Sequence, residues 1–300
     1  MEQIVIAKEY TYHERQALID LLCEKYKFIK RFTIGKSCMG KSITALKIGN
    51  SKSYSLITAA THGSERITSL VLLMFISDLC RAITVGESIE GVNVRKGLLG
   101  RGVIFVPCVN PDGCDISLLG KSACGLRGVE YSNLCRGDFK KWNANARGVD
   151  INHNFDAGWE ILRKKEISLG IVGPGPTRYG GIRPHSEPET NALVDLCRNT
   201  NIRHVVSLHS QGEVIYWTYG SKIPEKSRQM AEIMATTSGY SLDIPIDIAT
   251  GGGFKDWFIK EFSRPGFTVE IGKGENPLPI SDANKIYNQI RELLMLSTIM

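Results

Sequence analysis

A histidine and a glutamate stand three positions apart in the segment THGSE, residues 61–65, as His62 and Glu65. The segment follows one apolar run and precedes another, which predicts a turn between a strand and a helix. Imidazole nitrogen and carboxylate oxygen both bind zinc, and a catalytic zinc site takes three protein ligands and keeps one position for water. The pair therefore predicts part of a zinc site. The alternative is a helix-capping glutamate beside a surface histidine.

A third ligand has to come from elsewhere in the chain. The remaining histidines are His13, His153, His185, His204 and His209. Of these, His209 stands near the end of the apolar run HVVSLHS, residues 204–210, and so close to the end of a predicted strand. Ligands of α/β proteins bind where strands end. We predict that His209 completes the site if its strand neighbours the strand before His62. A hydrogen-bonded histidine at a strand edge is the alternative.

A zinc peptidase also needs a general base, and Glu270 is the candidate. It lies in the apolar run FTVEIG, residues 267–272, where an unpaired carboxylate is costly unless a cation such as Zn²⁺ lies close. Zinc lowers the pKa of its bound water toward about 7, and a neighbouring carboxylate takes the proton and passes it to the leaving amine. A buried structural glutamate is the alternative.

Alternating strands and helices have to position these residues. The patterns predict helices over residues 11–26, 66–83 and 281–296, and strands over residues 43–50, 53–60, 102–110, 204–210 and 265–272. Residues 113–148 are expected to form a long surface excursion. Residues 173–190 are expected to form a Gly/Pro loop, with Ser186 capping a helix that passes through Pro188. The alternation predicts an α/β sheet flanked by helices on both faces, in a single domain over residues 1–300 with residues 1–9 as a lead-in.

The composition indicates a globular chain without a nucleic-acid or membrane partner. Charged residues make up 23% of the 300 residues, the formal net charge is +6 and the sequence pI is about 8.8. Lys and Arg are scattered among acidic residues rather than gathered in a block, which argues against nucleic-acid binding. No stretch approaches about 18 consecutive apolar residues, which argues against a membrane span. The sequence leaves the oligomeric state open.

The eight cysteines include no CxxC pair, and several stand in apolar runs where a reduced thiol packs as a small hydrophobe. The N-terminus has no basic segment followed by an apolar one, so no signal peptide is predicted. We therefore expect a reducing, cytoplasmic location, with a spore-related compartment as the alternative. Cys114, Cys124 and Cys135 are a candidate metal or disulfide cluster, but their irregular spacing favours ordinary thiols.

The segments THGSE, NPDG, RGVDINHNF, SLHS and TVEIG, in this order, resemble the M14 metallocarboxypeptidase family. The resemblance covers the chain from about Tyr10 to its end. It implies a single α/β domain with a mixed sheet and one zinc ion per chain at the carboxyl ends of the strands. It assigns the metal ligands and the base to His62, Glu65, His209 and Glu270. Asp150 matches a carboxylate that orients His62 through its other ring nitrogen.

The chain departs from the family pattern where substrate is bound. Asn152-His153 stands where typical carboxypeptidases have Asn-Arg, and a histidine cannot make the two parallel hydrogen bonds by which that arginine holds a terminal carboxylate. Ile248 occupies the place of a usual tyrosine. The arginine that polarises the scissile carbonyl has no clear counterpart. Lys141 is the first candidate for this role and Arg147 the second, with a solvated loop cation as the alternative for both.

These departures point to a subgroup. The segments NANARGVDINHNFDAGW, GPTRYGG, SEPET, SLHSQGE, GGGFKDW and GENPLP resemble bacterial γ-D-glutamyl–diamino acid endopeptidases, which cut peptidoglycan stem peptides between D-Glu and meso-diaminopimelate. The resemblance implies a muropeptide substrate. Arg178, Arg147 and Lys255 are the loop cations that we expect to bind its carboxylates. Gly252, in a Gly-rich turn, could let a D-residue approach the backbone, with a flexible loop as the alternative.

Two other functions stay open at this point. One is a zinc carboxypeptidase that removes C-terminal residues, with a basic residue such as Arg178 binding the terminal carboxylate. The other is a catalytically silent peptide-binding protein on this fold, because a fold does not imply a function. The intact four-residue site argues against silence, since a binding protein has no chemical need for Glu270.

Overall fold

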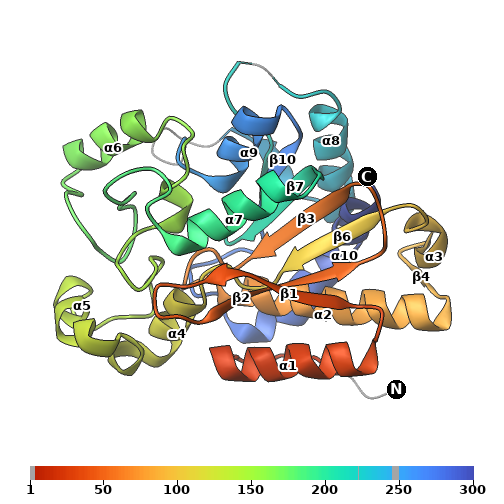
Figure 1. Ribbon diagram of the computed structural model, residues 1–300, viewed down its shortest axis with the longest axis horizontal. Coiled ribbons are helices and arrows are strands. Elements are labelled where there is room, and N and C mark those ends of the chain that lie inside the picture. The colour runs from red at the N-terminus through yellow and green to blue at the C-terminus, as the bar shows by residue number, and fades with distance from the viewer. Residues whose placement is uncertain (1–3, 222, 245–249) are drawn as a thin grey trace.

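An eight-stranded sheet runs through the centre of the computed structural model, which describes residues 4–221, 223–244 and 250–300 (Figure 1). Its strands lie in the order β1-β2-β6-β3-β7-β10-β8-β9. The central strands β6, β3, β7 and β10 are parallel, whereas β1, β2 and β8 form antiparallel pairs. The strands are β1 (Lys30–Lys36), β2 (Ser42–Ile48), β3 (Tyr54–Ala59), β6 (Gly102–Val106), β7 (Ile202–His209), β8 (Val214–Tyr216), β9 (Ser241–Asp243) and β10 (Gly266–Glu270), with a separate hairpin of β4 (Ser88–Ile89) and β5 (Val92–Asn93). The prediction of a mixed α/β sheet is confirmed.

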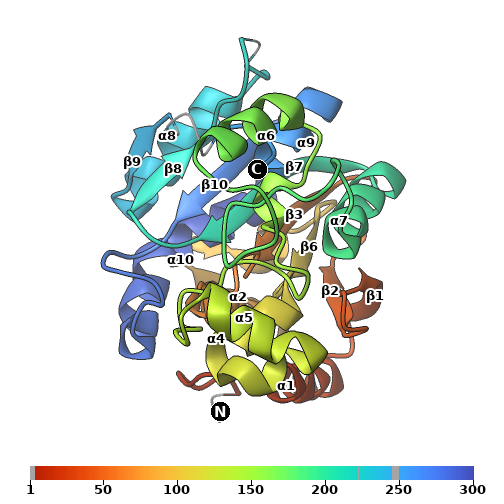
Figure 2. The ribbon, with the colours of Figure 1, turned by 90° about the vertical axis from the view of Figure 1, so that its left-hand side faces the viewer.

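Helices cover both faces of the sheet (Figure 2). One core lies between the sheet and α1, α2, α8 and α10, and a second lies between the sheet and α7 and α9. Successive side chains of a strand point to opposite faces, so Ile57 of β3 enters the first core and Leu56 the second. The helices are α1 (Tyr12–Lys25), α2 (Arg66–Val85), α3 (Val94–Gly97), α4 (Pro111–Leu119), α5 (Gly128–Leu134), α6 (Trp159–Ser168), α7 (Pro188–Asn199), α8 (Ser227–Ser238), α9 (Phe254–Phe262) and α10 (Ala283–Ile299). Short 3₁₀ turns are η1 (Gly120–Ala123), η2 (Gly125–Arg127), η3 (Ile151–His153) and η5 (Ile280–Asp282).

Helix α2 leads away from the predicted metal site through the first core. It begins after Glu65 and ends at Gly86, which adopts a left-handed conformation with φ 79° and donates its N–H to the carbonyl of Ala82. By length and composition α2 could cross a membrane, but 72% of its most apolar window is buried against the rest of the protein. Its apolar surface therefore packs in the core, and its first turn is held rigidly at the edge of the sheet.

Two features of local structure differ from expectation. Residues 113–148 lie largely at the surface beyond the first turns of α4, as expected, but they also contain α4 and α5, which were not predicted and enclose a small core that includes Ile116, Tyr131 and Trp142. Their short helices give little periodicity in the sequence. Ser186 does not cap α7: the N-cap residue is Glu187, and the Ser186 hydroxyl donates to the carboxylate of Glu187 at 2.8 Å.

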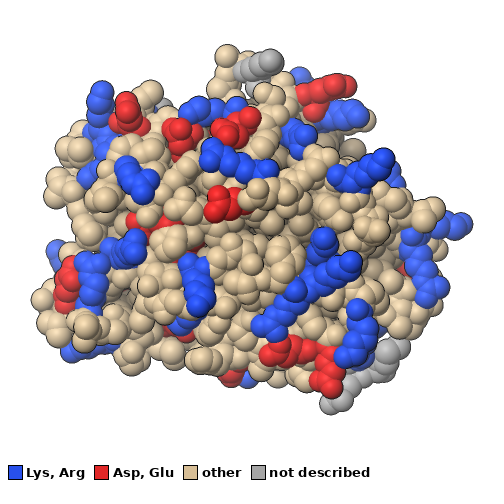
Figure 3. All heavy atoms as spheres, in the orientation of Figure 1, with Lys and Arg blue, Asp and Glu red and all other residues tan. Residues whose placement is uncertain are grey.

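Surface charges are spread in small groups. On the face shown in Figure 3, Lys and Arg side chains lie dispersed with Asp and Glu among them. Several form ion pairs, such as Arg198 with Glu261 and Arg127 with Glu130. The charged side chains of this face are therefore dispersed rather than concentrated in one block.

Candidate metal centre and its pocket

Three neighbouring parallel strands end at the same edge of the sheet, and the predicted site residues lie there. β7 ends at His209 and β10 at Glu270, and these two residues are paired in register. β3 lies on the other side of β7, ends at Ala59 and leads directly into His62 and Glu65. Residues from distant parts of the sequence therefore meet because the carboxyl ends of parallel strands share an edge.

The turn before α2 is fixed by a second turn that follows β6. Asn110 in that second turn donates from Nδ2 to the carbonyl of Thr61 at 3.1 Å. Gly63 packs so closely against it that a Cβ atom would lie 2.3 Å from the carbonyl oxygen of Gly113. Only glycine fits at this position, so the segment THGSE has a single backbone path that presents its histidine and glutamate to the sheet edge.

His62, Glu65 and His209, hereafter the metal triad, bring one ligand atom each within 4.8 Å of one another. Nδ1 of His62 lies 2.7 Å from Oε1 of Glu65, and Nδ1 of His209 lies 3.0 Å from Oε2 of Glu65. The two Nδ1 atoms are 3.3 Å apart. Glu65 is the N-cap residue of α2, but its side chain makes no capping hydrogen bond, so the alternative of a helix-capping glutamate does not hold.

The chemistry of the metal triad fits a divalent cation. Nε2 of His62 lies 3.1 Å from Oδ1 of Asp150; when it donates there, Nδ1 presents a lone pair toward Glu65 and His209. The contact between His209 and Oε2 of Glu65 lacks hydrogen-bond geometry, and this buried oxygen has no hydrogen-bond donor among the described residues. Two imidazoles and one carboxylate, with space beside them, are a donor set typical of catalytic zinc.

The electrostatics of the site also favour positive charge between these side chains. Burial disfavours the charged form of His62, but the carboxylates of Glu65 and Asp150 outweigh burial and raise its pKa well above 6.5. Burial raises the pKa of Glu65, yet the two histidines prevail and lower it to about 2. Charge pairing therefore dominates over desolvation at this point of the sheet edge.

Asp150 is held as a hydrogen-bond acceptor behind His62. Its Oδ1 also accepts the N–H of Asn152 at 3.1 Å, and its Oδ2 accepts the N–H of Arg178 at 2.8 Å. Burial alone would raise the pKa of Asp150, but the adjacent charges of His62 and His153 lower it below its ordinary value. The structure thus places Asp150 where the sequence comparison expects it, fixing the ring orientation of His62.

Glu270 faces the metal triad from β10. Its side chain reaches the pocket described below and has no hydrogen-bond or ion-pair partner among the described residues. Burial raises its pKa to about 7, which the neighbouring His209 only partly offsets. A carboxylate of this pKa can accept a proton near neutral pH and release it again.

A pocket of about 140 Å³ opens beside the metal triad. Its lining combines the triad's two histidines with residues of η3, β8, α9 and β10. They are His62, Asn152, His153, His209, Tyr216, Gly253, Lys255, Asp256, Thr268 and Glu270. The structure therefore brings Asn152, His153 and Lys255 to the site, as predicted from the sequence comparison.

The imidazole of His153 is locked in position from behind. Its Nδ1 lies 2.8 Å from Oε1 of Glu166, a carboxylate with 0% exposure. Oε2 of Glu166 in turn accepts from Arg163 at 2.9 Å and from the N–H of Gly180 at 3.1 Å. His153 can therefore offer the pocket only its Nε2 atom. Sequence reasoning missed Glu166, because nothing in the polar helix segment RKKE distinguishes an inward carboxylate from a solvated one.

Lys255 reaches the pocket in a different way from that expected. It is not a loop cation: it lies in the first turn of α9, is 5% exposed and pairs with Asp256. Asp256 and Tyr216 were not predicted. The adjacent letters K and D inside the otherwise apolar GGGFKDWF were a usable signal for a buried pair, whereas Tyr216 lies on a three-residue strand that is too short to show a pattern.

The other predicted cations lie outside the pocket. Lys141 is exposed and forms an ion pair with Glu275, so its assignment as the cation that polarises the carbonyl is wrong. Arg147 lies 3.7 Å from Glu187, beside a separate hollow. Arg178 contributes its backbone N–H to Asp150, but its exposed side chain is not part of the pocket lining. Loop positions in the sequence gave no information on which cations would point inward.

Gly252 has a structural role in the backbone and does not line the pocket. It adopts φ +73°, and a Cβ there would lie 2.5 Å from a methyl group of Leu162 and 2.9 Å from the carbonyl oxygen of His153. Its own carbonyl accepts the N–H of Phe155 at 2.8 Å. The glycine is therefore needed for close packing under the pocket. Ile248, which replaces the usual tyrosine, lies outside the described residues.

A second group of potential ligands, hereafter the Cys38 cluster, consists of Cys38, Glu187 and Glu189. Asn145 donates from Nδ2 to Oε2 of Glu187 at 2.8 Å and to Oε2 of Glu189 at 3.1 Å. Sequence reasoning did not find this cluster, because Cys38 stands about 150 positions before the two glutamates in the chain. The cysteine cluster it considered does not form: Cys114 instead lies 3.7 Å from Cys108, sulfur to sulfur.

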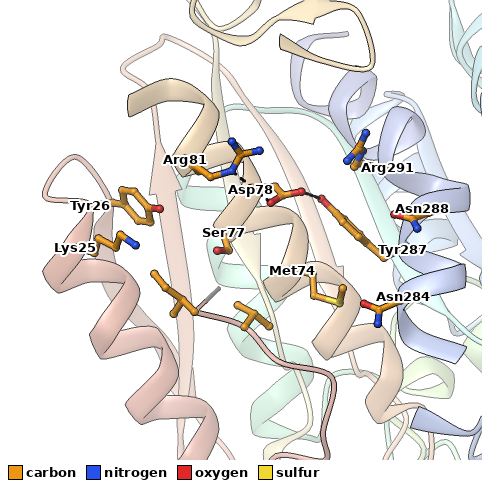
Figure 4. A pocket seen from close by; sticks show the side chains of 12 residues that line it. Lys25, Tyr26, Met74, Ser77, Asp78, Arg81, Asn284, Tyr287, Asn288 and Arg291 are labelled. Carbon is orange, nitrogen blue, oxygen red and sulfur yellow. Dashed lines mark hydrogen bonds and ion pairs between the residues drawn. The ribbon is translucent and has the colours of Figure 1, made fainter. Parts of the chain in front are cut away.

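A larger hollow of about 320 Å³ lies between the end of α1, α2 and α10 (Figure 4). It contains none of the predicted site residues. Its wall on α2 begins at Met74, nine residues beyond Glu65, which at a rise of ~1.5 Å per residue is roughly 13 Å along the helix. Tyr287 donates there to Asp78 at 2.5 Å, and Arg81 lies 3.9 Å from the same carboxylate. The carboxylate of Asp78 is thus engaged within the hollow, and neither group of potential metal ligands found among the described residues lies there.

Residues 16–293 match the sequence profile of the family described as zinc carboxypeptidase. The chain is 35% identical over 286 residues to γ-D-glutamyl-L-diamino acid endopeptidase 1 of Lysinibacillus sphaericus, which covers 94% of this chain and 70% of that protein. It is 29% identical over 218 residues to murein peptide amidase A of Escherichia coli K12, covering 69% of this chain and 66% of that protein.

Similarity to a solved structure supports the fold. Bovine thrombin-activatable fibrinolysis inhibitor, solved in complex with a tick carboxypeptidase inhibitor, superposes with a TM-score of 0.73 at 20% identity. The match covers 98% of this chain and 96% of that chain. At this level of identity the match shows a common fold, and it agrees with the mixed sheet and two-sided helix layers described above.

Proposed function

The chain belongs to the zinc carboxypeptidase family and is a metallopeptidase, and from this premise we propose that it hydrolyses peptidoglycan stem peptides between γ-D-Glu and meso-diaminopimelate. The name of the Lysinibacillus sphaericus relative, at 35% identity, supports this bond, and the murein peptide amidase supports a cell-wall peptide as the substrate class. We propose one zinc ion per chain, bound by the metal triad.

The observation that carries the proposal is the cation content of the pocket. Its described lining includes no arginine, and its one lysine, Lys255, is paired with Asp256. By the family resemblance, His153 occupies the position at which a carboxypeptidase presents an arginine. A guanidinium binds a terminal carboxylate with two parallel hydrogen bonds, whereas His153 has a single nitrogen available. A free C-terminus should therefore confer little advantage, which favours an endopeptidase over a carboxypeptidase.

The residues of the chain divide the hydrolysis between them. Zinc bound here would polarise the scissile carbonyl and lower the pKa of a water molecule toward about 7. Glu270 accepts the proton of the attacking water and delivers it to the leaving amine, because its carboxylate faces the pocket beside the metal triad. Asp150 keeps His62 in the tautomer that directs Nδ1 toward the ion.

Product analysis tests the proposal. Purified protein is incubated with L-Ala-γ-D-Glu-meso-diaminopimelate, with and without a chelator, and the products are identified by mass spectrometry. We expect L-Ala-D-Glu and free diaminopimelate, loss of turnover with chelator and recovery on adding zinc. We also expect cleavage of the same bond when D-Ala follows the diamino acid. Efficient trimming of an ordinary C-terminal L-residue, with the stem peptide intact, would overturn the proposal in favour of a carboxypeptidase.

A further inference from the structure

Lys255 and Asp256 form a buried ion pair in the wall of the substrate pocket. We propose that this pair binds the far end of the substrate's diamino acid side chain, with Lys255 contacting its carboxylate and Asp256 its ammonium group. The inference rests on the proposed function, and it assigns substrate selection to the distal ammonium and carboxylate of the diamino acid. Apart from the metal triad, His153 and Glu270, these two residues are the acidic and basic side chains of the described lining.

The pair has hydrogen-bonding capacity left for a ligand. Nζ of Lys255 donates to Asp256 and, at 2.6 Å, to the carbonyl of Thr218. Oδ2 of Asp256 accepts the N–H of Gly251 at 2.8 Å. An ammonium group has three donors and a carboxylate about four acceptor positions, so among the described residues one donor and about two acceptor positions are unused. They lie next to each other, because the two residues are adjacent on the first turn of α9.

Burial makes the pair expensive to keep for stability alone. Lys255 is 5% exposed and Asp256 is 2% exposed. Removing two charges from water costs several kcal/mol per ion, and well-packed apolar residues of similar size are commonly as stable as a buried pair. The same helix carries a solvated counterpart, Lys260, which lies 3.4 Å from Asp156 with both side chains about half exposed. Only the buried pair faces the pocket.

The chemistry of the ligand follows from the two opposite charges. The distal carbon of meso-diaminopimelate carries an ammonium and a carboxylate, so it can complement both members of the pair. L-lysine carries only the ammonium and offers no acceptor to the remaining donor of Lys255, while a side chain that ends in a carboxylate offers no donor to the remaining acceptor positions of Asp256. A site built from buried polar groups rejects an analogue that lacks the matching group, because its own group is then left unpaired.

Four substrates test this with the holoenzyme. Each is L-Ala-γ-D-Glu-X, where X is meso-diaminopimelate, L-lysine, L-2-aminopimelate with a carboxylate alone, or L-norleucine with neither charge. We expect kcat/KM to be highest for diaminopimelate, lower by roughly 10- to 100-fold for norleucine, and intermediate for the two singly charged side chains. Equal rates on all four substrates would overturn the inference while leaving the proposed function standing.

Two variants separate the two contacts. Asp256→Asn should lower kcat/KM for diaminopimelate and lysine but not for aminopimelate. Lys255→Gln should lower it for diaminopimelate and aminopimelate but not for lysine. Lys260→Met is the matched control, because it removes a lysine from the same helix outside the pocket, and it should leave the order of the four substrates unchanged. Uniform losses on all four substrates in both variants would refute the assignment.

Folding and the proposed function are checked separately. Thermal unfolding and zinc content are measured for each variant. If a single variant fails to fold, the double variant Lys255→Gln with Asp256→Asn keeps a neutral hydrogen-bonding pair and should treat the four substrates alike; a retained preference for diaminopimelate would overturn the inference. Failure of the proposed function gives a different result, which is no cleavage of any γ-D-Glu–X bond by the native protein.

Discussion

The metal triad and the Cys38 cluster both bring potential metal ligands within 4.8 Å, yet their carboxylates are satisfied in different ways. In the Cys38 cluster all four carboxylate oxygens accept hydrogen bonds. Glu187 accepts from Ser186 and Asn145, and Glu189 accepts from Asn145 and from the N–H of Cys38 at 2.9 Å. In the metal triad, Oε2 of Glu65 has no hydrogen-bond donor among the described residues.

The comparison shows that proximity of ligand atoms does not by itself make a metal site. Buried carboxylates need compensation, which comes from hydrogen-bond donors or from a cation. The Cys38 cluster receives donors and joins α7 to the turns around Asn145 and Cys38. The metal triad faces two imidazoles and a pocket, and lacks such donors. We therefore expect metal at the triad and structural stabilisation at the Cys38 cluster.

The largest effect is expected on zinc content, which should depend on the metal triad and not on the Cys38 cluster. A double variant, His62→Ala with His209→Ala, should fall from about one zinc per chain to nearly none and lose measurable turnover, because a single carboxylate cannot hold the ion. Elemental analysis and stem-peptide hydrolysis measure both quantities. Cys38→Ser is the matched control and should keep its zinc. Undiminished zinc in the double variant would contradict the assignment of the triad.

The second largest effect is expected on turnover when Glu270 is replaced. Glu270 lies beside the metal triad but is not one of its ligands. Glu270→Gln keeps the shape of the side chain and removes the proton acceptor, so kcat should fall roughly 100-fold or more with zinc content unchanged. The control is Glu275→Gln, an exposed carboxylate paired with Lys141. Near-normal turnover of the Glu270 variant would place the base at another residue.

A smaller effect tests the structural role of the Cys38 cluster. Asn145→Leu removes the amide that donates to both carboxylates, so the free energy of unfolding should fall by about 2–4 kcal/mol. Urea denaturation measures it, with the exposed Asn133→Leu as the control. Zinc content of the folded protein should not change. A variant that loses zinc but keeps its stability would reverse the roles of the two groups.

The smallest effect concerns pH. Burial raises the pKa of Glu189 above its unfolded value of 4.5, so the folded protein holds this proton more tightly. The stabilisation from this group is therefore complete below pH 4.5 and is lost as the pH rises through the folded pKa. Glu189→Gln replaces one accepting oxygen with an amide group and has no carboxyl to titrate. As the pH rises from 4.5 to 7, the melting temperature of the native protein should therefore fall by a few degrees relative to that of this variant. The exposed Glu130→Gln variant should not show this relative fall, and a difference that grows on acidification would have the wrong sign.

Apolar runs in the sequence located the strands that carry the site. The predicted strands over residues 53–60, 204–210 and 265–272 correspond to β3, β7 and β10. Strand β1 was missed because its sequence, KRFTIGK, is polar and lies at the sheet edge, where little burial shapes the pattern. The helices α4 and α5 were missed because each is short, and because the residues that α4 buries are mostly polar or small and give no apolar periodicity.

By itself the sequence identified the candidate metal ligands and the candidate base, because distinctive residues flank each of them. His62 and Glu65 share one turn, and His209 and Glu270 end apolar strands, so residue type and flanking pattern marked them as candidates and the family resemblance assigned their roles. The cations had no such setting. Lys141 and Lys255 both follow polar or glycine-rich segments, yet one pairs with Glu275 at the surface and the other lies buried in the pocket wall. Only the packing of α9 against β7 and β10 decided this, because the direction of a long side chain depends on which elements enclose it.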